Sequence, residues 1–283
     1  MTIAVTGSTG QLGRLAIAAL KSRVAASDII ALARDTAKAG DLSVTVRPFD
    51  YQKPETLVPA LKGVDTLVLI SSNDFMDRAK DHAAVIDAAK AAGVGRIVYT
   101  SILKGAASPL LLATDHIKTE AVLKASGIPH TNLRNGWYTE NYTGSLGGAL
   151  QAGAMIGSAG DAKISAAPRK DYAEAIAVVA TTTGHDGKSY ELAGDKPFTM
   201  TEMAAEVSRQ TGKTIPYNSL PEATYTGILQ SFGLPEAFAA KLADSDVQSA
   251  KGHLRDDSQT LSKLIGRPTT PMADTVKAAL AAL

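Results

Sequence analysis

The chain has 283 residues, with 29 Lys and Arg against 28 Asp and Glu, and it contains no cysteine. This length is sufficient for one large core or for two joined lobes. The net charge of +1 argues against a nucleic-acid partner, which requires a clear basic excess or patch. The lack of cysteine excludes disulfides, thiolate metal sites, iron–sulfur clusters and a cysteine nucleophile.

Neither a targeting segment nor a membrane-spanning segment is visible. The first residues lead directly into a structural pattern, without the basic region and apolar run of a signal peptide. No stretch reaches the roughly 18 apolar residues that a membrane helix requires. We therefore expect a cytoplasmic protein with no membrane partner.

The first half of the chain alternates short β-branched runs with helical runs rich in Ala and Leu. The strand runs are almost continuously apolar, which is typical of parallel strands covered on both faces. This alternation predicts an α/β fold with a Rossmann-type, doubly wound parallel sheet. Strands are expected at residues 3–6, 29–33, 44–47, 67–71, 96–100 and 130–134, and helices at 12–23, 55–61, 78–92 and 114–126.

The second half has a different pattern. Residues 149–164 are rich in Gly, which predicts a hairpin or an irregular segment. Thr199 and Glu202 have the spacing of a capping box before an apolar run. The charged region 244–257 is expected to be a solvent-exposed face. A strand is expected at 189–193, and helices at 171–180, 199–211, 221–232, 235–242 and 258–265.

A glycine-rich turn follows the first predicted strand and precedes the first predicted helix. Gly7 allows a tight turn, Gly10 lets the backbone approach a diphosphate, and Gly13 lets the helix pack closely on the strand. The helix N-terminus offers free N–H groups to the phosphates. The alternative is a purely structural turn. This context predicts a dinucleotide site formed by Gly7, Ser8, Thr9, Gly10, Gln11, Leu12 and Gly13.

The end of the second predicted strand bears on the choice between NAD and NADP. An NAD site usually has an acid there that binds the ribose hydroxyls. Here the strand ends Ala33-Arg34, and Asp35 comes one residue late. Arg34 can form a forked contact with a 2′-phosphate, which a carboxylate would repel. We therefore predict NADPH rather than NADH, with a solvated loop arginine as the alternative for Arg34.

Polar residues also end the third and fourth predicted strands, at the carboxyl edge where such sheets bind ligands. Asp50 can accept a hydrogen bond from the adenine amino group, or it can cap its own turn. Ser71, Ser72 and Asn73 are small polar residues that suit the cofactor diphosphate and ribose.

These assignments divide the chain into two predicted domains. The NADP-binding domain comprises residues 1–135, and the helix and strand within 166–194 return to it. Residues 136–165 and 195–283 form a smaller, mostly helical lobe that would bind the substrate.

Several segments together resemble the NmrA-like group of atypical short-chain dehydrogenases/reductases. They are the glycine turn, the Asp50 strand end and the more specific run Arg134-Asn135-Gly136-Trp137-Tyr138. Segments at 190–195 and 264–270 extend the likeness over nearly the whole chain. Within the group, the likeness is greatest to bacterial NADPH:quinone oxidoreductases, with triphenylmethane-dye reductases as close relatives.

This resemblance implies a cofactor domain, a small substrate domain and a cleft between them. It also implies which residues face the cofactor or the cleft. For Arg169 in this set, an ion pair with Asp171 or Glu174 is the alternative. Besides the residues already named, the set comprises Tyr138, Thr139, Glu140, Asn141, Tyr142, Thr143 and Arg169.

One departure from the wider superfamily is informative. Ordinary members carry a Tyr that protonates the product oxygen and a Lys four residues later. An alignment through Glu120 places Leu112 and His116 at these positions, so the Tyr is absent. Reducing a ketone leaves a basic alkoxide that requires an acid, whereas reducing a quinone leaves a ring-stabilised phenolate that can wait for water. The absence therefore favours a quinone-like or dye-like acceptor.

Candidates for catalysis are His116, Asn135 and Tyr138. Because imidazole titrates near neutrality, His116 can supply a proton or bind the nicotinamide ribose; a purely structural histidine is the alternative. The other histidines lack metal-ligand spacing, so no metal is expected.

Candidates for substrate contact are Phe75, Trp137 and Tyr142. Aromatic rings at the carboxyl edge of a sheet can stack on a flat acceptor. A hydrophobic plug between the lobes is the alternative.

The predicted function is direct two-electron hydride transfer from NADPH to a small quinone-like acceptor, with water or His116 supplying protons. Neither flavin nor metal is expected, and a homodimer is compatible with this prediction. Two alternatives stay open: a non-catalytic NADP(H)-binding redox sensor that regulates a partner protein, and a reductase of triphenylmethane dyes or imine-type substrates.

Overall fold

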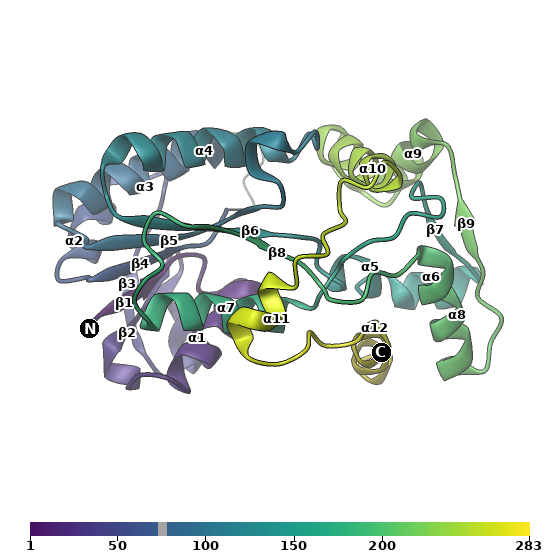
Figure 1. The fold of residues 1–283 in the computed structure, drawn as a ribbon, viewed down its shortest axis with the longest axis horizontal. Helices are drawn as coiled ribbons and strands as arrows, with labels where there is room; N and C mark the ends of the chain where they lie inside the picture. Colours follow the sequence, from purple (N-terminus) through teal and green to yellow (C-terminus); the bar gives the residue numbers. More distant parts are fainter. Residues whose placement is uncertain (73–77) are drawn as a thin grey trace. The chain divides into compact units, whose positions relative to one another are not determined.

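The structure, a computed structural model, describes residues 1–72 and 78–283, which form two compact units (Figure 1). The predicted domain boundary keeps residues 106–114 with the sheet, whereas the structure groups Ala106–Thr114 with the second unit. Unit 1 comprises Met1–Gly105, Asp115–Asn135 and Arg169–Glu191, and unit 2 comprises Ala106–Thr114, Gly136–Pro168 and Leu192–Leu283.

Unit 1 is built on a sheet that has, among the described residues, seven strands in the order β3-β2-β1-β4-β5-β6-β8. β1 pairs in parallel with both β2 and β4, so the winding reverses at this point of the sheet. Ligands of open α/β sheets bind beyond the carboxyl ends of the strands at such a reversal. The strands are β1 (Ile3–Val5), β2 (Ile29–Ala33), β3 (Thr45–Pro48), β4 (Thr66–Leu69), β5 (Arg96–Ile102), β6 (His130–Asn135) and β8 (Ser189–Leu192).

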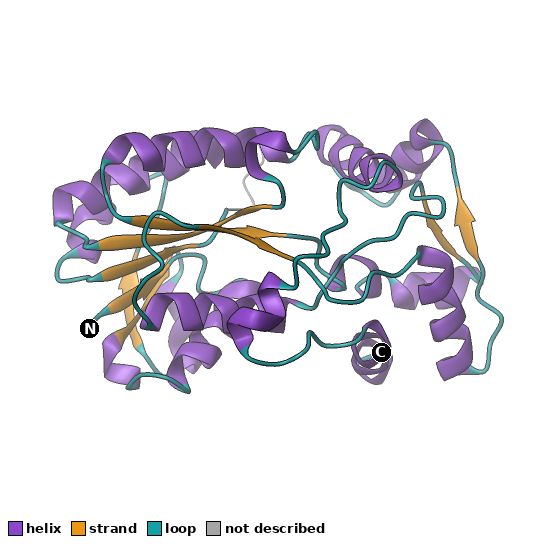
Figure 2. Ribbon diagram, in the orientation of Figure 1, coloured by secondary structure: helices purple, strands orange, loops and turns teal. Residues whose placement is uncertain are grey.

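Helices cover both faces of this sheet, as Figure 2 shows. On one face α2 packs against α3, and on the other α1 packs against α7. This arrangement confirms the predicted doubly wound α/β fold. The helices are α1 (Gln11–Lys21), α2 (Leu57–Leu61), α3 (Arg78–Ala92), α4 (Ala113–Ser126) and α7 (Arg169–Thr181).

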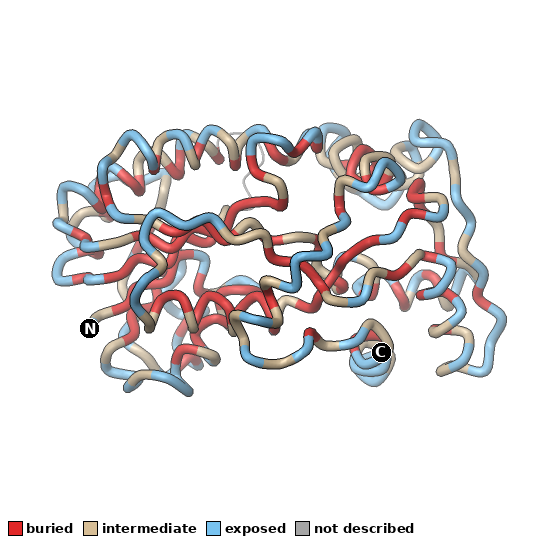
Figure 3. Tube along the Cα trace, viewed as in Figure 1, coloured by how far each residue is buried: buried red, intermediate tan, exposed pale blue. Residues whose placement is uncertain are grey.

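The core of unit 1 follows from the apolar runs in the sequence. Every residue of β1, β2 and β4 is buried, whereas the edge strand β3 is partly exposed (Figure 3). On α1, Leu12, Ile17 and Leu20 are buried on one face, as expected of an amphipathic helix on a sheet. The sheet edge that carries the glycine turn is therefore held by a rigid, fully buried centre.

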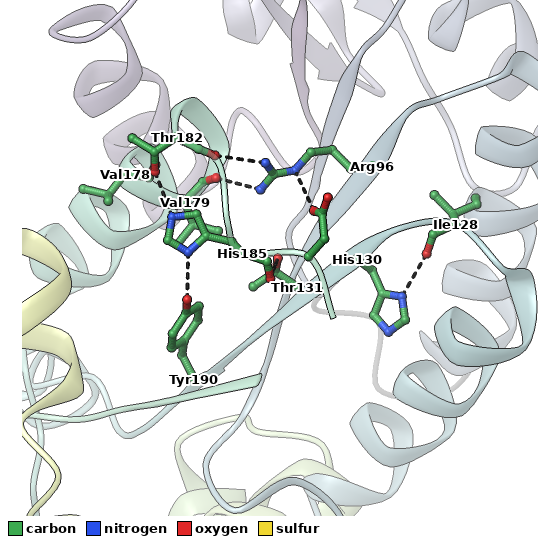
Figure 4. Close-up of polar contacts among 10 residues, drawn as sticks. Arg96, Ile128, His130, Thr131, Val178, Val179, Thr182, His185 and Tyr190 are labelled. Carbon is green, nitrogen blue, oxygen red and sulfur yellow. Dashed lines mark hydrogen bonds and ion pairs between the residues drawn. The ribbon is translucent and has the colours of Figure 1, made fainter. Parts of the chain in front are cut away.

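Arg96 attaches the end of α7 to the start of β5, as Figure 4 shows. Its guanidinium donates to the carbonyl oxygens of Val179 and Thr182 at 2.7 and 3.1 Å. These carbonyls lie at or beyond the last turn of α7, where a cation also complements the helix dipole. Beside them, the ring of His185 contacts the hydroxyls of Thr182 and Tyr190, each at 2.8 Å. Both ring nitrogens of His185 are thus engaged within the fold.

Unit 2 is mostly helical, and its described residues include a two-stranded parallel sheet, β7 with β9. Helix α8 begins with the predicted capping box of Thr199 and Glu202, which is confirmed. The helices are α5 (Glu140–Thr143), α6 (Leu146–Ala152), α8 (Met200–Thr211), α9 (Glu222–Ser231), α10 (Glu236–Ala250), α11 (Thr260–Ile265) and α12 (Met272–Ala281), and the strands are β7 (Met155–Gly157) and β9 (Tyr217–Ser219).

The structure excludes one of the two alternatives predicted for residues 149–164 and corrects the prediction for residues 244–257. Residues 149–164 do not form a hairpin, because β7 pairs in parallel with β9, about sixty residues later, and a parallel pair requires a long crossover. The region 244–257 is not simply a solvent-exposed face, because Asp244 and Asp246 on α10 are buried. Their carboxylates accept hydrogen bonds from the backbone N–H groups of Leu111 and Ser158, both at 2.8 Å.

Candidate active site

The glycine turn has the geometry expected of a phosphate cradle. Gly7 has a φ of +58°, a left-handed conformation that favours glycine, and its carbonyl accepts from the N–H of Gly10 at 2.9 Å. A Cβ on Gly13 would overlap the carbonyl group of Gly7, so close packing of α1 on the turn requires glycine there. The buried Ser8 hydroxyl donates to the carbonyl of Leu32 at 2.8 Å and ties the turn to β2. The start of α1 thus directs backbone N–H groups beyond the end of β1.

The two charged residues after β2 differ in how the fold uses them. Asp35 accepts a hydrogen bond from the N–H of Ala37 at 3.1 Å and so caps the short helical segment that follows. The Arg34 side chain is exposed and has no hydrogen bond or ion pair to any described residue. Because Asp35 is committed to its own turn, Arg34 is the residue here that remains available for an anion.

The ends of β3 and β4 supply further polar groups. The Asp50 carboxylate accepts from the N–H of Gln52 at 3.1 Å, which is a turn-capping contact. The N–H groups of Ser71 and Ser72 donate to Thr100 and His82 at 2.8 and 3.1 Å, but the two serine hydroxyls are buried without a partner among the described residues.

Two predicted site residues on the segment after β4, Asn73 and Phe75, lie outside the described residues.

The buried serine hydroxyls indicate a ligand, because buried hydroxyls without partners are uncommon in native proteins. At the winding reversal of the sheet, the hydroxyls of Ser71 and Ser72 therefore fit a polar ligand.

His116, on α4, belongs to a buried hydrogen-bonded network that includes Tyr99 of β5. Its Nδ1 is 2.9 Å from the hydroxyl of Tyr99 and its Nε2 is 3.4 Å from Nη1 of Arg78. A second buried histidine, His82, lies beside it, with Nδ1 3.0 Å from the hydroxyl of Thr119. The role of His82 could not be predicted, because a buried histidine that completes a hydrogen-bonded network has no characteristic sequence spacing.

The network fixes the protonation of both histidines. The N–H of Ser72 donates to Nε2 of His82, and the Arg78 guanidinium can only donate to Nε2 of His116. Each ring therefore carries its proton on Nδ1. Burial lowers the pKa of His82 to about 3 and, together with the charge of Arg78, lowers the pKa of His116 well below its usual value. Both rings are thus neutral near pH 7, which favours water over His116 as the source of protons.

Arg134, in the run that carries the family resemblance, has a structural partner set. Its guanidinium binds both carboxylate oxygens of Glu120 at 2.7 and 3.0 Å and one oxygen of Glu191 at 3.0 Å. The two acids raise the pKa of Arg134 further above its usual value. Ser101 donates to Glu120 at 2.6 Å and completes the network. Arg134 therefore links β6 to α4 and β8.

The residues after Arg134 cross from unit 1 into unit 2. Asn135 is buried at the end of β6, and Trp137 is buried as well, being only 8% exposed. Tyr138 forms a parallel bridge with Ala167, and the N–H of Thr139 donates to the Ala167 carbonyl at 3.0 Å. The remaining predicted residues occupy two helix starts: Glu140, Asn141, Tyr142 and Thr143 form α5, and Arg169 is the first residue of α7.

The position that holds a catalytic Tyr in the wider superfamily is Leu112, which is half-buried in the turn before α4. The wider superfamily has its catalytic Lys at the position of His116, and Lys118, two residues later, is exposed on α4. Within residues 1–72 and 78–283, no cluster of three or more His, Asp or Glu is arranged to hold a metal ion. In the same parts of the chain, no helix has the length and apolar character needed to cross a membrane.

Comparisons with known proteins show the family to which the chain belongs. The NmrA-like family matches over residues 1–267. Quinone oxidoreductase 2 of Escherichia coli (strain K12) is 53% identical over 277 residues, which cover 97% of this chain and 97% of that protein.

Solved structures of related proteins support the same family assignment. The Escherichia coli NADPH-dependent quinone oxidoreductase in complex with NADPH matches with a TM-score of 0.95 and 52% identity, covering 99% of this chain and 100% of that chain. Triphenylmethane reductase of Citrobacter sp. in complex with NADP(H) matches with a TM-score of 0.92 and 37% identity, covering 98% and 100%. These matches confirm the resemblance on which the sequence prediction rests. The chain therefore belongs to the NmrA-like family.

Proposed function

We propose that the chain is an NADPH-dependent oxidoreductase that transfers two electrons, as a hydride, to a quinone-type acceptor. The observation that carries this proposal is the 53% identity to a quinone oxidoreductase over 97% of both chains. At this identity and coverage, the site as well as the fold is expected to be shared.

The described residues of unit 1 fit the cofactor. A Cβ on Gly13 would overlap the backbone of Gly7, so α1 packs closely on the turn, as it does in a dinucleotide-binding site. The buried hydroxyls of Ser71 and Ser72 have no partner among the described residues and suit the polar parts of a dinucleotide. The exposed, uncommitted guanidinium of Arg34 suits a 2′-phosphate. NADPH is therefore the cofactor that these residues favour.

When bound, the reduced nicotinamide supplies the hydride. The chain's own residues explain which acceptor suits that chemistry. Leu112 replaces the proton-donating Tyr, and the neutral His116 ring is committed to Tyr99 and Arg78. A carbonyl that becomes an alkoxide would lack an acid here. A quinone becomes a hydroquinone anion, a stabilised phenolate that water can protonate.

The substitution Arg34→Gln tests cofactor choice. We expect it to weaken NADPH binding about 10- to 100-fold, because a forked contact with the 2′-phosphate is lost, and to leave NADH binding unchanged. Fluorescence titration of both cofactors measures this. Arg255→Gln, another exposed arginine change but in unit 2, is the matched control and should alter neither affinity. Wild-type protein that binds NADH more tightly than NADPH would overturn the cofactor assignment.

An anaerobic acceptor panel tests the reaction. We expect quinone-dependent loss of the reduced-nicotinamide absorbance without added flavin. The second candidate activity, reduction of triphenylmethane dyes, is favoured by the 37% identity to the Citrobacter sp. enzyme over nearly the whole chain. Comparing kcat/KM for a quinone and for a dye cation separates the two. If NADPH binds but neither acceptor is reduced, the chain is a sensor rather than an enzyme.

A further inference from the structure

Unit 2 contains a group of buried and half-buried polar side chains that the proposed reaction does not yet use. They come from α5, the segment after β7, β9, α9 and α10, all within unit 2 (Figure 1). We name them the tyrosine–aspartate cluster: Tyr142, Ser158, Tyr217, Tyr225 and Asp246.

The backbone at residues 157–159 brings two of these side chains together. Asp246, only 6% exposed, accepts at Oδ2 from the N–H of Ser158 at 2.8 Å. The Tyr217 hydroxyl oxygen accepts from the N–H of Ala159 at 3.0 Å. A Cβ on Gly157 would lie 2.7 Å from Oδ2 of Asp246 and 2.8 Å from the hydroxyl of Tyr217. Only glycine therefore lets the carboxylate and the phenol approach the same stretch of backbone.

Two hydroxyls of the cluster have no partner in the part of the chain that the structure describes. The hydroxyl oxygens of Tyr142 and Ser158 are buried, and neither has a hydrogen bond to any described residue. Ser158 as a whole is 9% exposed. Native folds seldom leave buried hydroxyls unpaired, because each then loses its bond to water without replacement. Each of these two hydroxyls can therefore donate a hydrogen bond to a ligand.

The charges around Tyr142 keep its hydroxyl a hydrogen-bond donor. Burial raises the pKa of Tyr142 well above its usual value, and the carboxylate of Asp246 and the phenols of Tyr225 and Tyr217 raise it further. Burial, and to a smaller extent the same carboxylate, raises the pKa of Tyr225 and Tyr217. All three phenols therefore stay protonated across the neutral range, so the ligand must supply an acceptor. The negative charge of Asp246 disfavours an anion.

We propose that the hydroxyls of Tyr142 and Ser158 donate hydrogen bonds to the carbonyl oxygens of a neutral quinone-type acceptor, an inference that rests on the proposed function. A quinone oxygen is an uncharged acceptor, which matches two unpaired donors beside a carboxylate. A triphenylmethane dye cation has no carbonyl oxygen to offer. The cluster thus gives this chain a preference for acceptors that carry a carbonyl group.

The test is Tyr142→Phe, which removes the hydroxyl and keeps the ring. We expect kcat/KM for a small neutral quinone to fall about tenfold, the equivalent of one lost hydrogen bond. We expect kcat/KM for a triphenylmethane dye to stay within about twofold. Protein loaded with NADP⁺ has no hydride to transfer, so it can bind the quinone without reducing it. Calorimetric titration of the same quinone into the two loaded proteins should show that Tyr142→Phe binds it more weakly than the wild type, by a similar factor.

Thermal unfolding separates a binding role from a structural one. Because the Tyr142 hydroxyl has no partner among the described residues, Tyr142→Phe should leave Tm unchanged or raise it. Ser158→Ala should act in the same direction on quinone affinity and likewise leave Tm unchanged. The matched control is Tyr190→Phe in unit 1, which loses a hydroxyl paired with His185 and should leave quinone affinity unchanged.

The calorimetry also separates the two ways of being wrong. If the wild-type protein binds the quinone and both Tyr142→Phe and Ser158→Ala keep its affinity, the cluster is not the acceptor site. If the wild-type protein reduces no quinone, the proposed function fails, and the quinone affinities of the variants still decide the inference. A wild-type protein that binds no quinone overturns both.

Discussion

Two buried polar groups of the molecule, one in each unit, differ in how their hydrogen bonds are made. In unit 1 the rings of His82 and His116 are engaged at both nitrogens within the fold. In unit 2 the tyrosine–aspartate cluster leaves the hydroxyls of Tyr142 and Ser158 without partners among the described residues. The two histidine rings and the two hydroxyl oxygens are all buried, so burial alone does not distinguish them.

The difference separates residues that hold the fold from residues that await a ligand. A paired buried group loses stability when its partner is removed, because the remaining group stays unsatisfied. An unpaired buried group already carries that penalty, so its removal is neutral or favourable. Measurements of stability can therefore tell the two kinds of buried group apart.

The largest effect is expected at Arg134, which belongs to the paired polar groups of unit 1. Arg134→Met should lower the free energy of unfolding by about 3 kcal/mol, because Glu120 and Glu191 would face each other without their cation. Urea unfolding followed by circular dichroism measures the change. The Arg134 side chain is 22% exposed, so solvent screens part of the loss.

Arg134→Lys is the matched variant for this prediction. It keeps the charge but not the fork that binds both acids, so about half of the loss should remain. NADPH affinity should stay at the wild-type value in both variants. A loss below about 1 kcal/mol, or a selective loss of NADPH affinity, would place Arg134 with the ligand-binding groups instead.

The sheet of unit 1 could be predicted because its signals are local. A parallel strand buried on both faces is a short apolar run, and the run at 29–33 coincides with β2. The glycine turn requires special backbone geometry at Gly7 and Gly13, so its function is visible in the residue types. The family resemblance then extended this local prediction to the whole chain.

Unit 2 and the roles of single side chains could not be predicted to the same extent. The strand that pairs with β7, β9, is about sixty residues away, and no local sequence pattern predicts this pairing. Asp246 looked like a surface charge because its burial depends on α10 packing near residues 157–159. Likewise, the sequence left open whether His116 is an acid, and only its contacts with Tyr99 and Arg78 make the neutral form clear.

The second prediction concerns the pH dependence that the paired histidines create. The pKa of His82 is about 3 in the fold, against 6.5 for a histidine in an unfolded chain. Below pH 6.5 the unfolded chain takes up a proton that the folded chain does not, so stability is lost as the pH falls. At pH 5 the loss from His82 should be about 2 kcal/mol relative to pH 7, and His116 acts in the same direction.

His82→Gln isolates the contribution of His82. Glutamine does not titrate, and its amide oxygen can still accept from the N–H of Ser72. The difference in unfolding free energy between pH 7 and pH 5 should therefore shrink by about 2 kcal/mol in urea titrations at the two pH values. An unchanged pH dependence would mean that His82 gains a proton in the fold as readily as in the unfolded chain.

The third and smallest prediction concerns Asp246 in the tyrosine–aspartate cluster, where the pH dependence of stability has the opposite sign. Burial raises the pKa of Asp246 from 3.8 to about 6, so the folded chain binds a proton more readily than the unfolded chain between these values. Stability is therefore lost as the pH rises through this window, and the loss persists at neutral pH.

Asp246→Asn removes the charge, while the amide oxygen of the asparagine still accepts the hydrogen bond from the N–H of Ser158. It should raise stability by about 1 kcal/mol at pH 7.5, since its new N–H₂ group offsets part of the gain. The gain should vanish near pH 4, where the wild-type carboxyl is already protonated in the fold. Thermal unfolding at both pH values checks this, and a variant less stable than wild type at pH 7.5 would show that the Asp246 carboxylate holds the fold as the histidines of unit 1 do.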